Sequence, residues 1–156
     1  MEIIALWFFL ALGVFLLILS LRKPPRKDLL LLFFTAAYLG SFLGMLVIEA
    51  QLITYPVKLL QSFPQNVLFE ALLLPTICIY YYQTSYQSNM IGSIWQALVY
   101  SGFLASAEFF LEKYTSLIKY LQWEWYYSWI SVLIFLVLVR FLMKLINKEA
   151  SQDRSV

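Results

Sequence analysis

The residues best suited to chemistry in this chain are four glutamates that lie within or beside long apolar stretches: Glu49, Glu70, Glu108 and Glu112. Ionisable side chains inside a membrane are costly, and they usually face other helices or water. Carboxylates gathered in such a place can bind a cation, carry protons or hold a basic ligand head. The first question is therefore whether these glutamates lie at the same depth.

Glutamates on three different apolar stretches are predicted to lie at a similar depth in the membrane. Glu70 lies about one turn inside the third stretch and Glu108 about one turn inside the fourth, which places both ~5–8 Å below the same boundary at 1.5 Å per residue. Glu49 ends the second stretch, and Glu112 follows Glu108 by one helical turn on the same face. The sequence thus predicts an acidic and aromatic site in the outer leaflet, with these ligand-binding residues: Glu70, Glu108, Glu49, Glu112, Trp123 and Trp125.

A simpler interpretation competes with this one for several of these glutamates. Near a helix end, where water reaches them, Glu49 and Glu112 can be ordinary interfacial charges. The candidate counter-charges for the acidic site are three lysines near the same boundary: Lys58, Lys113 and Lys119.

The elements that must position these residues are membrane helices. Of the 156 residues, 62% are hydrophobic and 13% are charged, whereas a soluble domain carries about 25% charged residues. The apolar runs reach about 18 residues or more, the length that a helix needs to cross a bilayer. We predict an all-α bundle of five transmembrane helices in a single domain, residues 1–148, with spans at about 3–21, 29–48, 67–82, 91–111 and 127–146.

The positive charges predict how this bundle is inserted. They gather after the first span, at Arg22, Lys23, Arg26 and Lys27, and near the end of the last, where Arg140, Lys144 and Lys148 can snorkel to the same face. Basic loops mark the cytoplasmic side, so the N-terminus is predicted outside and the C-terminus inside. Residues 149–156 are predicted to form a disordered cytoplasmic tail, and the outer loops at 49–65 and 112–126 to form amphipathic helices.

Two positions inside the predicted spans bear on helix packing. Gly40 and Gly44, four residues apart, predict that a neighbouring backbone approaches the second span closely. Pro75 lies in the middle of the third span, where it is expected to kink the helix and free a carbonyl.

Composition excludes several classes of function. The chain has no histidine and a single cysteine, Cys78, in a predicted span, so it offers neither an intrachain disulfide nor the commonest metal ligand and general base. No basic run is long enough for nucleic acid. We expect no cofactor, and membrane lipids as partners, with a second copy of the chain or another membrane protein as a further partner.

Several motifs resemble an uncharacterised family of small multi-spanning integral membrane proteins from endospore-forming bacteria. They are Phe69-Glu70 with Pro75 downstream, Ala107-Glu108, Glu112-Lys113-Tyr114-Thr115, Leu117-Ile118-Lys119-Tyr120 and Trp123-x-Trp125. The resemblance covers most of residues 30–145. It implies a bacterial plasma membrane, or a spore membrane, and it implies no reaction.

Three functions remain open at this point. The first is a binding protein that holds a cation, a lipid head group or a small amphiphile at the acidic-aromatic site. The second is a transporter or an ion or proton channel component that works as an oligomer. The third, ranked last because no nucleophile motif or phosphate-cradling loop is present, is an intramembrane enzyme that uses paired carboxylates as acid and base.

Overall fold

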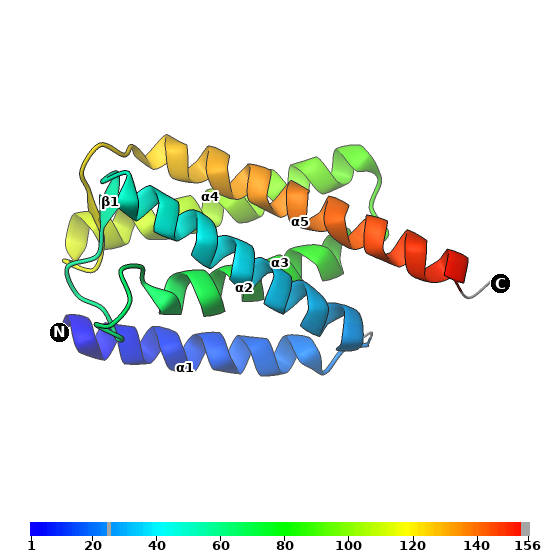
Figure 1. The fold of residues 1–156 in the computed structure, drawn as a ribbon, viewed down its shortest axis with the longest axis horizontal. Coiled ribbons are helices and arrows are strands. Elements are labelled where there is room, and N and C mark those ends of the chain that lie inside the picture. The colour runs from blue at the N-terminus through cyan, green and yellow to red at the C-terminus, as the bar shows by residue number, and fades with distance from the viewer. Residues whose placement is uncertain (25, 154–156) are drawn as a thin grey trace.

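Helical segments that alternate in direction make up most of the described chain (Figure 1). The computed structural model describes residues 1–24 and 26–153. Its helical elements are α1 (Glu2–Leu21), α2 (Arg26–Glu49), the π-helical turn η1 (Leu68–Leu73), α3 (Leu74–Ser85), α4 (Met90–Tyr114) and α5 (Trp125–Asp153). Two short strands, β1 (Ile53–Thr54) and β2 (Lys119–Tyr120), lie together at one end, called the sheet end below. The opposite end, which holds the link between α1 and α2, is called the basic end.

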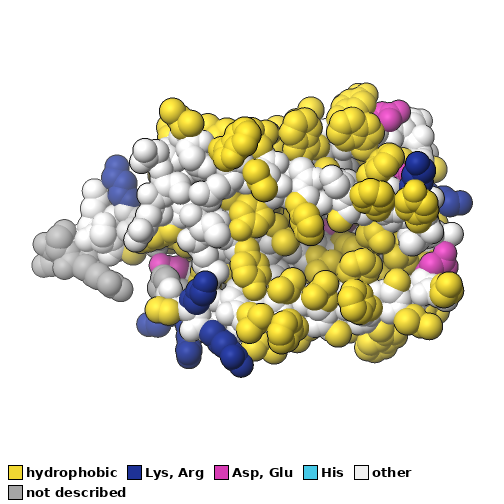
Figure 2. All heavy atoms as spheres, turned by 180° about the vertical axis from the view of Figure 1, so that it is seen from behind, with side chains coloured by type: hydrophobic (Ala, Val, Ile, Leu, Met, Phe, Trp, Pro, Cys, Tyr) yellow, Lys and Arg dark blue, Asp and Glu magenta, His cyan; other side chains and the backbone are white. Residues whose placement is uncertain are grey.

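Four of these helices, α1, α2, α4 and α5, are long and apolar enough to cross a membrane. Large apolar side chains such as Phe34, Trp95 and Phe103 are more than 60% exposed on them. Figure 2 shows a broad hydrophobic band along the middle of the molecule. Most of the charged side chains lie at its two ends. A contiguous apolar surface of this extent marks a membrane or protein interface, so the prediction of an all-helical membrane protein is confirmed at this level.

The third predicted span forms two joined pieces. The six residues of η1 run directly into the twelve of α3, giving a continuous helical rod of roughly 27 Å at 1.5 Å per residue. Pro75 explains the wide turn before it, because it has no N–H to donate and its ring clashes with the carbonyl of an α-helical turn. The N–H of Leu74 instead reaches the Phe69 carbonyl, five residues back, and Thr76 Oγ1 donates to the Leu72 carbonyl at 2.6 Å.

The loops at the sheet end differ from the prediction. Residues 51–66 and 115–124, all described, contain no helix, so the predicted amphipathic outer-loop helices are wrong. The two loops instead pair through β1 and β2 as an antiparallel sheet, and Leu117 and Ile118, whose spacing suggested a helix, lie in an apolar cluster beneath it. Each loop thereby satisfies backbone groups of the other, which removes the need for a helix.

Two features at the basic end also differ from expectation. Helix α5 continues to Asp153, so the tail predicted as disordered from residue 149 is helical that far, and residues 154–156 lie outside the described part. Arg140 was expected to snorkel, yet it is buried, and its Nη2 donates to the Ser85 carbonyl at 2.8 Å and the Ser88 carbonyl at 3.4 Å. It therefore satisfies carbonyls at the C-terminus of α3, where a cation is also favoured by the helix dipole.

Candidate functional site

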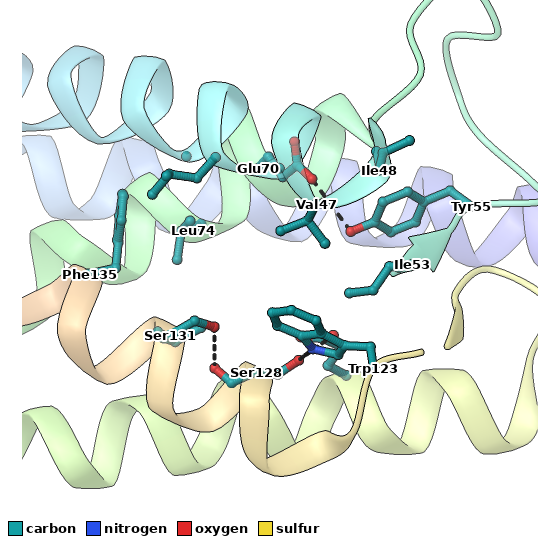
Figure 3. Close-up of a pocket in the computed structure, with 15 residues that line it drawn as sticks. Val47, Ile48, Ile53, Tyr55, Glu70, Leu74, Trp123, Ser128, Ser131 and Phe135 are labelled. Carbon is teal, nitrogen blue, oxygen red and sulfur yellow. Dashed lines mark hydrogen bonds between the residues drawn. The ribbon is translucent and has the colours of Figure 1, made fainter. Parts of the chain in front are cut away.

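A cavity of about 160 Å³ lies near the sheet end, between α2 and η1 on one side and α4 and α5 on the other. Figure 3 shows Glu70 and Tyr55 facing it from one side and Trp123 and Ser128 from the other. Glu108 and Ser131 also line it, and the other walls are apolar; Phe135 belongs both to these walls and to the apolar core of the bundle. A mostly apolar pocket with a few convergent polar groups is the usual form of a small-molecule site.

Glu70 contributes one of the two carboxyl groups of the cavity. It is 8% exposed, and its position in the wide turn η1 directs it towards α2 and the first outer loop. Tyr55 donates a long hydrogen bond of 3.5 Å to Oε1, whereas Oε2 is buried with no hydrogen-bond partner. An unpaired buried acceptor costs about 1–3 kcal/mol, and more when it is charged. Glu70 is thus placed at an energetic cost that a cationic or hydrogen-donating ligand would offset.

Tyr55 is held in its protonated, donating form. Burial, and next the nearby carboxylate of Glu70, raise the pKa of this phenol well above its ordinary value. Because the negative phenolate is disfavoured in such surroundings, Tyr55 presents a hydroxyl and an aromatic ring to the cavity.

The predicted glycine pair explains how Glu70 fits against α2. A Cβ atom added at Gly44 would overlap the Glu70 carboxyl group, and one at Gly40 would lie 3.1 Å from the Glu70 backbone carbonyl. The close backbone approach predicted for this pair is therefore confirmed at Gly40, where η1 lies against α2, whereas at Gly44 the Glu70 side chain occupies the space.

Glu108 reaches the same cavity from α4, and its carboxyl group is well supplied with donors. Oε1 accepts from Ser128 Oγ at 2.8 Å and from the Tyr120 hydroxyl at 3.0 Å. Trp123 Nε1 in turn donates to Ser128 Oγ at 2.7 Å. These bonds join α4 to β2, the second outer loop and α5, so Glu108 is fixed in position where Glu70 is left with an unused oxygen.

Three of the six predicted site residues line this cavity, namely Glu70, Glu108 and Trp123. Glu49 is the exposed last residue of α2, and Glu112 lies on α4 outside the cavity lining. Trp125 is 49% exposed and lines a separate hollow between α4 and α5.

The three lysines proposed as counter-charges have other neighbours. Lys58 donates to the backbone carbonyls of Phe63 and Pro64. Lys113 lies over the rings of Phe109 and Tyr114, and Lys119 is an exposed residue of β2.

Sequence reasoning missed Tyr55, Tyr120 and Ser128. The two tyrosines reach the glutamates because the two outer loops pair, and no local sequence pattern predicts that pairing. Ser128 lies twenty residues beyond Glu108, and its one available signal was its position in the first turn of the last apolar stretch, where a serine can face a neighbouring helix.

The described residues contain no group of three or more His, Cys, Asp or Glu side chains that could hold a metal ion. Comparisons of the chain with family profiles, with curated proteins and with solved structures give no match. The fold and the site define a class: a helical membrane protein with a carboxyl-bearing, largely apolar cavity near one end of its bundle.

Proposed function

We propose that the protein binds the cationic head of a small amphiphile, such as an alkylammonium, in the cavity between Glu70 and Glu108. The observation that carries the proposal is the buried Glu70 Oε2, which lacks a partner beside a cavity that a second carboxyl group also lines. A positive head would offset the cost of both carboxylates, and the apolar walls would accept the first carbons of its chain.

The aromatic lining supports a cationic head over a neutral one. Tyr55 and Trp123 lie on opposite sides of the cavity (Figure 3), and an ammonium over an aromatic face gains about 0.5–2 kcal/mol, most when it is desolvated. A volume of about 160 Å³ is smaller than the 300–1,000 Å³ or so of a site for a drug-sized ligand. It suits a head group with a short length of chain, the rest of which would lie in the membrane.

Binding is favoured over transport by what lies beneath the cavity. Phe135 forms part of its walls, and beyond it the bundle is filled by a cluster of buried apolar residues that includes Leu32, Ile79 and Leu136. A cation would have to cross this dry layer to reach the basic end, at a cost of several kcal/mol. We therefore infer that a single copy of the chain holds its ligand at one side of the membrane.

Thermal unfolding of the purified protein in a neutral maltoside detergent tests the proposal, with decyltrimethylammonium as the probe. A ligand that binds the folded state adds about 2.7 kcal/mol of stability at one hundred times its Kd, so Tm should rise with probe concentration. Glu70→Gln and Glu108→Gln should remain folded and lose this rise. The matched controls, Glu49→Gln and Glu112→Gln, remove the same charge outside the cavity and should keep it.

Two results would overturn the proposal. The first is an equal rise in Tm with decyl maltoside or decyl sulfonate, which would mean that the chain alone is recognised. The second is an unchanged response in both Glu70→Gln and Glu108→Gln.

We also infer that the protein crosses a bacterial plasma membrane five times, with η1 and α3 as the third crossing and the N-terminus outside. The basic residues at one end of the bundle and the alternating direction of the helices support this. In a Cys78→Ser background, a membrane-impermeant maleimide added to intact cells should label Ser62→Cys and spare Gln87→Cys. The reverse pattern would refute the orientation.

A further inference from the structure

A second cavity, of about 310 Å³, lies at the basic end, where the link between α1 and α2 meets the end of α3. Its polar lining comes from Lys23 and from five residues of the last turns of α3 and just beyond: Tyr80, Tyr82, Gln83, Thr84 and Tyr86. None of these residues belongs to the site described above. The chemistry of the cavity follows from which of their hydrogen atoms are already engaged.

Three of these side chains donate hydrogen bonds to carbonyl groups of the protein itself. The Tyr80 hydroxyl donates to the Leu16 carbonyl at 2.9 Å, and Gln83 Nε2 donates to the Ser20 carbonyl at 2.9 Å. Thr84 Oγ1 donates to the Tyr80 carbonyl at 3.0 Å. The first two bonds join α3 to α1.

The donors that remain are the Lys23 ammonium, the hydroxyls of Tyr82 and Tyr86, and the second N–H of Gln83. The Tyr82 oxygen accepts from Asn147 Nδ2 at 3.1 Å, which leaves its own hydrogen to donate elsewhere. The rings of Tyr82 and Tyr86 meet edge to face, with centroids 5.6 Å apart, so their hydroxyls share one wall. An ammonium and two phenol hydroxyls offer hydrogen-bond donors in excess of acceptors, which is the inventory of an anion site.

The charge around the cavity has the same sign. Four basic residues, Arg22, Lys23, Arg26 and Lys27, lie in the link and the first turn of α2, opposed there by Asp28 alone. Figure 2 shows a cluster of Lys and Arg side chains at this end, beside the hydrophobic band. Basic pockets between membrane helices at the cytoplasmic face recognise anionic lipid head groups.

We propose that this cavity binds the phosphodiester head of an anionic phospholipid. Its phosphate oxygens would accept from Lys23, Tyr82 and Tyr86, as charge-assisted bonds. Its acyl chains would run along the apolar surface of α2, where Leu30 and Phe34 are exposed next to the buried Leu29 of the cavity wall.

Titration of the purified protein with a short-chain phosphatidylglycerol tests this, against phosphatidylcholine of the same chains and inorganic phosphate alone. We expect phosphatidylglycerol to raise Tm and the other two to leave it unchanged. Each basic residue near an anionic surface contributes about 1 kcal/mol, so Lys23→Gln should weaken the apparent affinity about fivefold. Tyr82→Phe should weaken it several-fold. Two controls should bind as the wild type: Lys148→Gln, an exposed basic residue of α5 outside the cavity, and Asn147→Ala, which loses the bond to Tyr82 and leaves its hydroxyl.

Several outcomes would overturn the proposal. A response to inorganic phosphate equal to that of the lipid would show a free-anion site. Equal losses for Lys23→Gln and Lys148→Gln would show a diffuse charge effect with no defined site. The Glu70→Gln variant separates this experiment from the one above, because it should respond to phosphatidylglycerol in full while it loses its response to the alkylammonium.

Discussion

Substitution of Gly44 by alanine should disable the cavity at the sheet end with little effect on stability. The added Cβ would occupy the space of the Glu70 carboxyl group, which lies at the free end of a flexible side chain. Glu70 can therefore move without any shift of the backbone, but it must leave the position from which it faces the cavity.

The stability change follows from what Glu70 would give up. Its Oε2 has no partner and its bond to Tyr55 is long, at 3.5 Å, so the displaced carboxyl group loses little. Alanine within a helix is favoured over glycine by about 1 kcal/mol. We therefore expect the free energy of unfolding of Gly44→Ala to lie within about 1 kcal/mol of that of the wild type. At Gly40 the new Cβ would meet a backbone carbonyl, and we expect a loss of about 1–3 kcal/mol from overpacking.

Denaturant unfolding and alkylammonium titration of the same samples measure both effects. Gly44→Ala should stay stable and lose the ligand response, whereas Gly40→Ala should be the less stable of the two. Gly92→Ala serves as the matched control, because its nearest contact would be an ordinary 3.5 Å to Ser88 Cβ. If Gly44→Ala folds and binds the probe with wild-type affinity, the Glu70 carboxyl group does not contact the ligand and the reasoning fails.

Three further changes test other parts of the structure. Glu70→Met combined with Tyr55→Phe should raise the stability of the ligand-free protein by about 1–3 kcal/mol, because the pair removes an unpaired buried oxygen and leaves no tyrosine hydroxyl without its acceptor; a lower Tm would contradict the burial argument. Gln51, just beyond the end of α2, has a φ of 56°, and the N–H groups of Gln51 and Leu52 donate to the carbonyls of Ile48 and Val47. Gln51→Gly should therefore stabilise the fold by about 0.5–1 kcal/mol, as urea unfolding would detect. Arg140→Leu should cost about 1.5–3 kcal/mol, since it removes a charged donor from the end of α3; a neutral result would show that water replaces it.

The helices were predictable because their signal is local. Runs such as 91–111 and 127–146 are apolar over a bilayer's thickness. The structure extends the first by a few residues, to Met90–Tyr114, and the second to Trp125–Asp153, seven residues beyond its predicted end. A helix was wrongly predicted around residues 114–125 because apolar residues three and four positions apart also occur by chance in an aromatic-rich loop. Pairing with a strand from another loop overrides such a weak helical pattern.

For the candidate site, the sequence could predict how far along its helix each glutamate lies, but not the direction in which its side chain points. Counting residues from the helix ends placed Glu49, Glu70 and Glu108 at similar heights. Which way each points depends on the rotation of its helix, and for Glu70 the wide turn before Pro75 sets that rotation. Glu49 ends its helix exposed, outside the cavity lining.

The bonding of Glu108 has a consequence for how the chain is assembled. Its two donors, Tyr120 and Ser128, both follow it in the sequence. A ribosome therefore delivers α4 to the membrane with this carboxyl group still lacking both partners; Tyr120 follows in β2 and Ser128 only in the first turn of α5. Because a lone charge within an apolar helix resists insertion, α4 and α5 are best suited to enter the bilayer as one hairpin, with β2 in the turn between them. A chain that stops before Ser128 would present Glu108 without one of its two donors.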